Sequence, residues 1–267
     1  MQIRTILLTG DDGYNSIGTR LLIHYLKDHY NLFIAGTKKQ QSGVGGYVNV
    51  GKDVHWKDIK VDGIKGICVD GTPGDAIEVT HAYLDSTFDL VISGINFGAN
   101  IGGSFFSSGT IAAYLRSKLL KLTKRGITIS HHSPDPKHWF HDHNRSNDIS
   151  TYLDYPGKSA YQVIQYSINK DLWGAEFINV NLPHKKTSKV KFTKPLNDLT
   201  KFYTYPGTID KTKGIYRYPM KIRELKNDIT SDGGVVQKGY ISITPCKADL
   251  LNEKIYKKIK NKTIQLK

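Results

Sequence analysis

The stretch Ile6-Leu7-Leu8-Thr9-Gly10-Asp11-Asp12-Gly13 places an apolar run directly before two adjacent aspartates. The run Thr5–Thr9 is typical of a buried β-strand, and Gly13 permits a tight turn after it. Adjacent carboxylates repel one another unless a cation neutralises them, and Mg²⁺ and Mn²⁺ prefer carboxylate, carbonyl and water oxygens. The stretch therefore predicts a strand that ends in a metal-binding turn. An exposed acidic turn is the alternative, because Asp-Gly is a common turn dipeptide.

Outward from this strand, the first two-thirds of the chain alternates short apolar runs with helical patterns. Ser16–His29 has apolar side chains at helical spacing, and Thr72-Pro73 has the residues of a helix start. Alternating strands and helices imply right-handed crossovers and a mostly parallel sheet, so the predicted fold class is α/β. The further expected strands are Leu32–Ala35, Gly66–Val69, Leu90–Ser93, Ile127–Ser130 and Phe177–Asn181, and the further expected helices are Ser108–Leu122 and Gly157–Ile168.

Polar, glycine-rich segments follow several of these strands. The carboxyl ends of parallel strands share one edge of the sheet, and ligands bind there. We therefore expect one site, built from the hydroxyl and N–H groups of Gln41–Gly46, the amide of Asn96 and a helix start at Ser107–Thr110. Such a helix start favours an anion, because its free N–H groups and its dipole point at the ligand. Taken singly, each loop is also consistent with ordinary turn chemistry.

The pattern changes after Pro183, where lysine and tyrosine become frequent and helical patterns fade. We interpret Ser188–Asp232 as an extended, hairpin-like excursion and Gly239–Thr244 as a returning strand, and we expect a basic helix at the end of the chain. This divides the chain into a core at 1–187 and an excursion at 188–267 within the same structural domain.

The composition, with 39% hydrophobic and 23% charged residues, is that of a soluble globular protein. No run approaches the roughly 20 apolar residues needed to cross a bilayer, and the first residues form a strand rather than a signal peptide. We therefore expect a cytoplasmic protein with no membrane partner. The formal net charge of +14 favours anionic partners such as nucleotides, polyphosphate or RNA, although a solvated basic face explains it equally well. Cys68 and Cys246 are expected to be buried thiols.

Five histidines lie in one short segment with two prolines, two aspartates and two aromatic residues. They are His131, His132, His138, His141 and His143, among Pro134, Asp135, Pro136, Trp139, Phe140 and Asp142. A solvated loop is the first interpretation. A lid in which an aromatic ring stacks on a base is the second. A second metal site is the third, because structural zinc sites usually show regular spacing.

Several segments, taken in order along the chain, form a larger pattern. After the opening strand and acidic turn they are Gln41-Ser42-Gly43-Val44-Gly45, Gly71-Thr72-Pro73-Gly74-Asp75, Asp89-Leu90-Val91-Ile92-Ser93-Gly94-Ile95-Asn96 with Gly98, Asn100 and Gly102 beyond, Ser108-Gly109-Thr110, Asn179-Val180-Asn181-Leu182-Pro183 and Gly239-Tyr240-Ile241-Ser242-Ile243-Thr244-Pro245. In order and spacing this pattern, from Ile6 to Pro245, resembles the SurE nucleotidase family.

The resemblance implies a Rossmann-like three-layer sandwich whose C-terminal excursion makes exchanged contacts within a homodimer or homotetramer. It implies hydrolysis of nucleoside 5′- and/or 3′-monophosphates, with a side activity on polyphosphate, and one divalent metal ion, Mg²⁺ or Mn²⁺, in each subunit. The implied metal ligands are Asp11, Asp12, Ser42 and Asn96, of which the two aspartates are also catalytic. The implied phosphate and substrate contacts are Ser108, Gly109, Thr110, Gly43 and Asn100.

The mechanism we predict is metal-assisted hydrolysis, in which the ion activates a water and Asp12 orients or deprotonates it. The helix start at Ser108–Thr110 would stabilise charge on the phosphoryl oxygens. An aspartyl-phosphate is less favoured, because the well-known acid phosphatase loop separates its two aspartates by one residue. The chain departs from the family at Gly10, where asparagine is usual, and at Arg116-Ser117, where a glutamate-glycine pair is usual. We expect both departures near the rim of the site.

Two other nucleotide-binding classes do not fit. Gly10, Gly13 and Gly18 lack the spacing of a dinucleotide fingerprint, and no lysine follows a glycine loop as in a P-loop. The remaining alternative is a binding protein that holds nucleotide or RNA on the same fold without hydrolysing it. Salt-sensitive RNA binding without phosphate release would favour that alternative.

Overall fold

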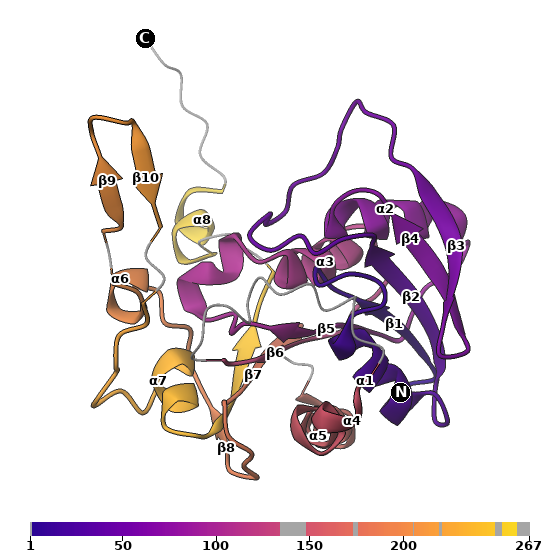
Figure 1. Ribbon diagram of the computed structural model, residues 1–267. Helices are drawn as coiled ribbons and strands as arrows, with labels where there is room; N and C mark the ends of the chain where they lie inside the picture. The colour runs from indigo at the N-terminus through magenta and orange to yellow at the C-terminus, as the bar shows by residue number, and fades with distance from the viewer. Residues whose placement is uncertain are drawn as a thin grey trace.

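The computed structural model describes residues 2–133, 148–172, 176–204, 206–218, 221–248 and 253–260, and its centre is a twisted sheet (Figure 1). The strands are β1 (Thr5–Thr9), β2 (Asn31–Thr37), β3 (Trp56–Val61), β4 (Ile64–Val69), β5 (Leu90–Phe97), β6 (Gly126–His131), β7 (Phe177–Leu182), β8 (Val190–Phe192), β9 (Thr208–Asp210), β10 (Ile215–Arg217) and β11 (Ile241–Cys246). The helices are α1 (Ile17–Leu26), α2 (Pro73–Tyr83), α3 (Gly109–Leu119), α4 (Ser150–Tyr152), α5 (Lys158–Asn169), α6 (Leu199–Phe202), α7 (Asp232–Gln237) and α8 (Glu253–Ile259), with a 3₁₀ turn η1 (Gly102–Phe106) and a π turn η3 (Leu153–Gly157).

The strand order in the described part of the sheet is β3-β4-β2-β1-β5-β6-β7-β11-β8. Strands β4, β2, β1, β5, β6 and β7 run parallel to one another, whereas β3 and β11 run antiparallel to their neighbours β4 and β7. The prediction of an α/β fold with a mostly parallel sheet is therefore confirmed. Thr9 at the end of β1 pairs with Ser93 of β5, so the turn after β1 leaves the sheet beside the last four residues of β5, which include Asn96.

Helices cover both faces of the sheet, which makes three layers (Figure 1). Ile6 and Leu8 of β1 pack in the cluster that contains the apolar residues of α1 and α5, and Leu7 between them packs in the cluster of α2 and α3. Successive side chains of a strand point to opposite faces, so one apolar strand buries residues in both layers. This is why the central strands read as continuous apolar runs rather than alternating ones.

The helices begin where the sequence has capping residues. Ser16 accepts a hydrogen bond from the backbone N–H of Thr19 at the start of α1, and Ser108 accepts one from Ile111 at the start of α3. Thr72 caps α2 and Pro73 occupies its first position, as predicted from the sequence. Each helix start therefore lies at a loop that leaves the carboxyl end of a strand.

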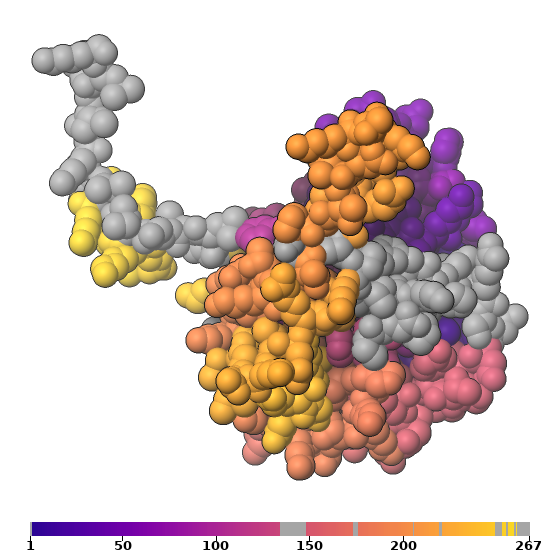
Figure 2. Space-filling model, turned by 60° about the vertical axis from the view of Figure 1, so that its left-hand side comes forward, coloured from indigo at the N-terminus to yellow at the C-terminus, as the bar shows by residue number. Residues whose placement is uncertain are grey.

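The C-terminal segment contains more regular secondary structure than the extended excursion that the sequence predicts. Within Ser188–Asp232, β8 joins the edge of the main sheet beside β11, and β9 pairs with β10 as a short hairpin. The hairpin projects from the body of the molecule (Figures 1 and 2). Strand β3 and helix α7 were not predicted. No helix in the described ranges is long and apolar enough to cross a membrane.

Candidate metal and phosphate site

The two aspartates that follow β1 are buried rather than exposed. Only 4% of the surface of Asp11 and of Asp12 is accessible to solvent. Gly13 has a φ of +104°, a backbone conformation that side-chain-bearing residues rarely adopt, so it makes the turn that the sequence predicts. An exposed acidic turn, the alternative interpretation, is therefore wrong.

Both carboxylates accept hydrogen bonds from neutral groups of other segments, namely α3, β5 and the loop after β2. The Thr110 hydroxyl donates to Oδ1 of Asp11. The backbone N–H of Phe97 donates to Oδ2 of Asp12 over 3.0 Å, and the Gln40 amide donates to Oδ1 over 3.1 Å. Burial raises the pKa of both carboxyl groups, and the charge of Asp11 raises the pKa of Asp12 further. Two neighbouring carboxyl groups that are shielded from solvent favour the binding of a proton or a cation, because either one reduces the repulsion between their charges.

Asn96 lies beside the aspartates. It shares with Asp11, Asp12 and Gly10 the lining of a narrow pocket. The amide nitrogen of Asn96 donates to the carbonyl of Gly98 over 2.6 Å, so the amide oxygen is the atom that could coordinate a cation. The structure thus brings together three of the four predicted ligands, although they come from the ends of two different strands.

The fourth predicted ligand, Ser42, belongs to a loop that is attached to the same turn. The backbone N–H of Gln41, its neighbour, donates to the carbonyl of Asp11 over 2.7 Å. Ser42 is partly exposed, and it is not among the residues that line the small pocket. Gly43 is exposed, and its φ of +80° favours glycine. The structure therefore places the loop next to Asp11.

The helix start at Ser108 lies directly against Asp11. A Cβ atom added to Gly109 would lie 2.8 Å from Cβ and 2.9 Å from Oδ2 of Asp11, so a side chain does not fit there. Thr110, which follows Gly109, is held by the Ser93 hydroxyl, which donates to the Thr110 carbonyl over 2.6 Å. The predicted phosphate-binding residues Ser108, Gly109 and Thr110 thus adjoin the acidic pair.

Asn100 has a different environment. Its amide nitrogen donates to the Ser130 hydroxyl over 2.9 Å, and its carbonyl accepts from the amides of Asn179 and Asn181 over 2.8 and 2.9 Å. This buried network joins the loop after β5 to β6 and β7. The Asn100 side chain thus bonds to Ser130 within this network, whereas the Thr110 side chain bonds to Asp11.

Gln40 and the backbone N–H of Phe97 were missed from the sequence. Gln40 precedes the Ser42 loop, and this position next to the motif is the only feature of the sequence that could have indicated its role.

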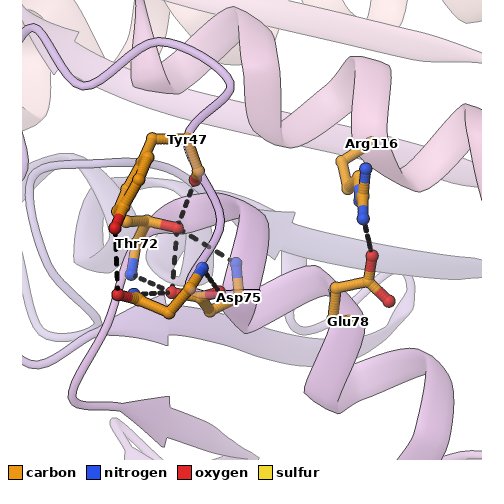
Figure 3. Close-up of polar contacts among 6 residues, drawn as sticks. Tyr47, Thr72, Asp75, Glu78 and Arg116 are labelled. Atoms are coloured by element: carbon orange, nitrogen blue, oxygen red, sulfur yellow. Dashed lines mark hydrogen bonds and ion pairs between the residues drawn. The ribbon is translucent and has the colours of Figure 1, made fainter. Parts of the chain in front are cut away.

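Arg116, expected near the rim, lies two turns into α3 and forms an ion pair with Glu78 of α2 (Figure 3). Of the histidine segment, His131 and His132 are buried at the end of β6. His138, His141 and His143 lie outside the described residues.

The donor set fits a hard divalent cation. In the part of the chain that the structure describes, no group of three or more His, Cys, Asp or Glu residues could hold a metal. An ion at this edge would therefore depend on two carboxylates supplemented by neutral oxygens, such as an amide, a hydroxyl and water. Oxygen donors of this kind suit Mg²⁺ and Mn²⁺ rather than zinc.

Comparisons with known proteins show the family to which the chain belongs. The family model described as Survival protein SurE matches residues 6–202. Two similar proteins named 5′-nucleotidase SurE come from Thermoanaerobacter sp. (strain X514), 30% identical with 92% of each chain covered, and from Campylobacter lari, 29% identical with 97% of each chain covered. The crystal structure of the SurE protein from Aquifex aeolicus matches 96% of this chain and 98% of its own, with a TM-score of 0.72 at 25% identity. The chain belongs to the SurE family.

Proposed function

We propose that this protein is a metal-dependent phosphomonoesterase that hydrolyses nucleoside 5′- and/or 3′-monophosphates. The observation that carries the proposal is the contact between a buried pair of carboxylates and the start of α3, where Gly109 leaves no space beside Asp11. A cation and a phosphate group would therefore meet at this point. The substrate class is supported by the name 5′-nucleotidase that similar proteins carry.

We propose Asp11, Asp12, Asn96 and Ser42 as the groups that would hold one Mg²⁺ or Mn²⁺ ion in each subunit. When bound, the ion would supply Lewis-acid polarisation of the phosphoryl group and a more acidic water. Burial keeps bulk water away from the two carboxylates and strengthens their interaction with a cation.

The remaining steps belong to the protein's own groups. The N–H groups at the start of α3 would bind the phosphoryl oxygens and stabilise the charge that spreads over them during transfer. Thr110 holds Asp11 in place through its hydroxyl, and Phe97 and Gln40 do the same for Asp12. With the cation bound, Asp12 would be ionised and would orient the attacking water or accept its proton.

The test is phosphate release from nucleoside 5′- and 3′-monophosphates with Mg²⁺ or Mn²⁺, with and without a chelator. We expect the chelator to abolish activity and Asp11→Asn to lower kcat by about 100-fold or more, since even residues outside the coordination shell cost 10–100-fold. Asp70→Asn is a matched control, because Asp70 is an exposed acid that pairs with Lys38. Wild-type activity of Asp11→Asn, or activity that survives chelation, would contradict the proposal. Including short-chain polyphosphate among the substrates tests the side activity.

We also propose that the excursion at 188–267, as distinct from the core at 1–187, contributes to a homodimer or homotetramer. Ile209, Tyr216 and Tyr218 on and beside the projecting hairpin are 62%, 44% and 75% exposed, and apolar groups clustered on a projection are typical of an interface. Light scattering on the purified protein measures the subunit number, and a monomer would exclude this assembly.

A further inference from the structure

The loop that carries Ser42 is bonded at its far end to the first turn of α2 (Figure 3). Oδ1 of Asp75 accepts from the backbone N–H of Asn49 over 2.9 Å, and Oδ2 accepts from the Asn49 amide over 2.6 Å. The Thr72 hydroxyl lies 2.7 Å from the carbonyl oxygen of Tyr47 and donates to it. Two side chains of α2 therefore hold the segment Tyr47–Asn49.

The same two side chains also close the capping box of α2. Oδ2 of Asp75 accepts from the backbone N–H of Thr72 over 2.8 Å, and the backbone N–H of Asp75 donates to the Thr72 hydroxyl over 3.2 Å. Asp75 is 4% exposed, so each of these bonds is made away from solvent. Because one carboxylate serves both the helix and the loop, neither can shift without breaking bonds to the other.

Glycines allow the loop to approach its supports. A Cβ atom on Gly74 would lie 2.6 Å from Cγ1 of Val48 and 3.1 Å from the Tyr47 carbonyl. Gly45 has a φ of +56°, and a Cβ atom there would lie 2.6 Å from the carbonyl oxygen of Phe106. A side chain at either position would push the loop away from α2 or from the segment that leads into α3.

The near end of the loop is attached to the site itself. The N–H of Gln41 bonds to the carbonyl of Asp11, and the N–H of Gly45 donates to the carbonyl of Ser107 over 3.0 Å. The loop is thus fixed at the acidic turn, at the start of α3 and at the start of α2. Ser42 lies between the first two of these attachments, and the third prevents the rest of the loop from swinging away.

We propose that Thr72 and Asp75 are positioning residues for the metal site, which act by holding the loop that carries Ser42 in its place beside the acidic turn. The proposal rests on the proposed function in one respect, that Ser42 contributes to holding the ion. Neither Thr72 nor Asp75 touches Asp11 or Asp12 in its hydrogen bonds. If the box were a helix cap alone, its loss would lower stability but leave the affinity for metal unchanged.

Asn49→Ala is the sharpest variant, because it removes the loop's side-chain bond to Asp75 and leaves the capping box intact. Asp75→Asn disturbs both functions, and Thr72→Val with Thr72→Ser tests whether the hydroxyl is sufficient. Glu78→Gln is the matched control, since Glu78 lies one turn further along α2 and pairs with Arg116 (Figure 3). Three quantities are measured on the full chain: hydrogen exchange of residues 44–49 without metal, Mn²⁺ binding by calorimetry, and the Mn²⁺ concentration that gives half-maximal phosphate release.

We expect Asn49→Ala, Asp75→Asn and Thr72→Val to exchange faster in this segment and to bind Mn²⁺ about 10-fold more weakly, as is typical of groups that orient metal ligands. Excess Mn²⁺ should restore much of their activity, and Thr72→Ser and Glu78→Gln should behave as wild type. Faster exchange with unchanged Mn²⁺ affinity would overturn the proposal and leave a helix cap. Should the wild type bind Mn²⁺ without releasing phosphate, the proposed function would be wrong, while the exchange and binding data would still decide the positioning role.

Discussion

Gly109 is the residue at which the start of α3 contacts the acidic pair. Its lack of a side chain lets the start of α3 touch Asp11, and the glycine lies in the helical region rather than at a positive φ. The constraint is therefore contact with Asp11, not backbone conformation. The sequence indicates that Gly109 is part of an anion site but does not show that Asp11 lies against it, because 97 residues lie between the two positions.

We predict that Gly109→Ala lowers kcat by about 100-fold, because a shift of about 1 Å in a reacting group costs this much. The added methyl group would displace either Asp11 or the helix start. Gly46→Ala is the control, since a Cβ atom at Gly46 meets no atom within 4 Å. Steady-state kinetics of the two variants check the prediction, and equal activity would show that the contact is unimportant for catalysis.

His132 should make the stability of the folded protein depend on pH. Burial, and then the charge of His184, lower the pKa of His132 to about 4, whereas an unfolded histidine has a pKa near 6.5. The unfolded chain therefore takes up a proton first as the pH falls, and folding loses up to about 3 kcal/mol from this group between pH 6.5 and pH 4. We expect His132→Gln to lose less stability over this range than wild type. Urea unfolding at pH 7 and pH 4.5 measures the difference, and parallel losses in both proteins would contradict it.

At the scale of elements, helix starts were predicted better than edge strands. The starts of α3 and α2 could be predicted from Ser108, Thr72 and Pro73. Capping hydrogen bonds and the fixed φ of proline depend only on residues that are neighbours in the sequence. β3 was missed because five of its six residues are exposed or only partly buried, so it lacks an apolar run. α7 was missed because it contains Gly233 and Gly234, which have poor helix propensity.

Two helix caps separate a stabilising role from a functional one. Ser108 caps α3 beside Asp11, and Ser231 caps α7 by accepting from the backbone N–H of Gly234. We predict that Ser108→Ala and Ser231→Ala each lower stability by about 1 kcal/mol, the usual loss for a removed cap. Only Ser108→Ala should also raise KM for nucleotide, because only α3 begins at the site. Thermal unfolding and kinetics of both variants test this, and an equal effect on KM would remove Ser108 from the substrate contacts.

At the scale of the whole molecule, a groove lined by basic side chains lies near the end of β6. Lys185, Lys221, Arg223 and Lys238 line a groove of about 1040 Å³, together with His132 at the end of β6 and a single acid, Glu224. β6 and β7 end at the same edge as β1 and β5. A positive groove at this place raises the local concentration of anions and is screened by salt.

We therefore predict that KM for a nucleoside monophosphate rises several-fold between about 50 and 500 mM salt, while kcat changes little. Lys221→Glu with Lys238→Glu should raise KM at low salt and reduce its salt dependence. Lys57→Glu with Lys60→Glu on the exposed edge strand β3 has the same change in net charge and serves as the control. If both pairs shifted KM equally, the effect would come from net charge rather than from the groove.

The α/β class, the central strands, the capped helix starts and the two acids at the end of β1 could all be predicted from the amino-acid sequence. These features depend on residues that are neighbours in the chain or on one apolar period, so local physics is sufficient. The tertiary structure alone decided that Asp11 is buried against Gly109, that Gln40 and the N–H of Phe97 hold Asp12, and that α2 holds the Ser42 loop. It also decided that Arg116 pairs with Glu78 of α2. Each of these contacts joins segments far apart in sequence, and their geometry follows from sheet order and helix packing, which no local pattern specifies.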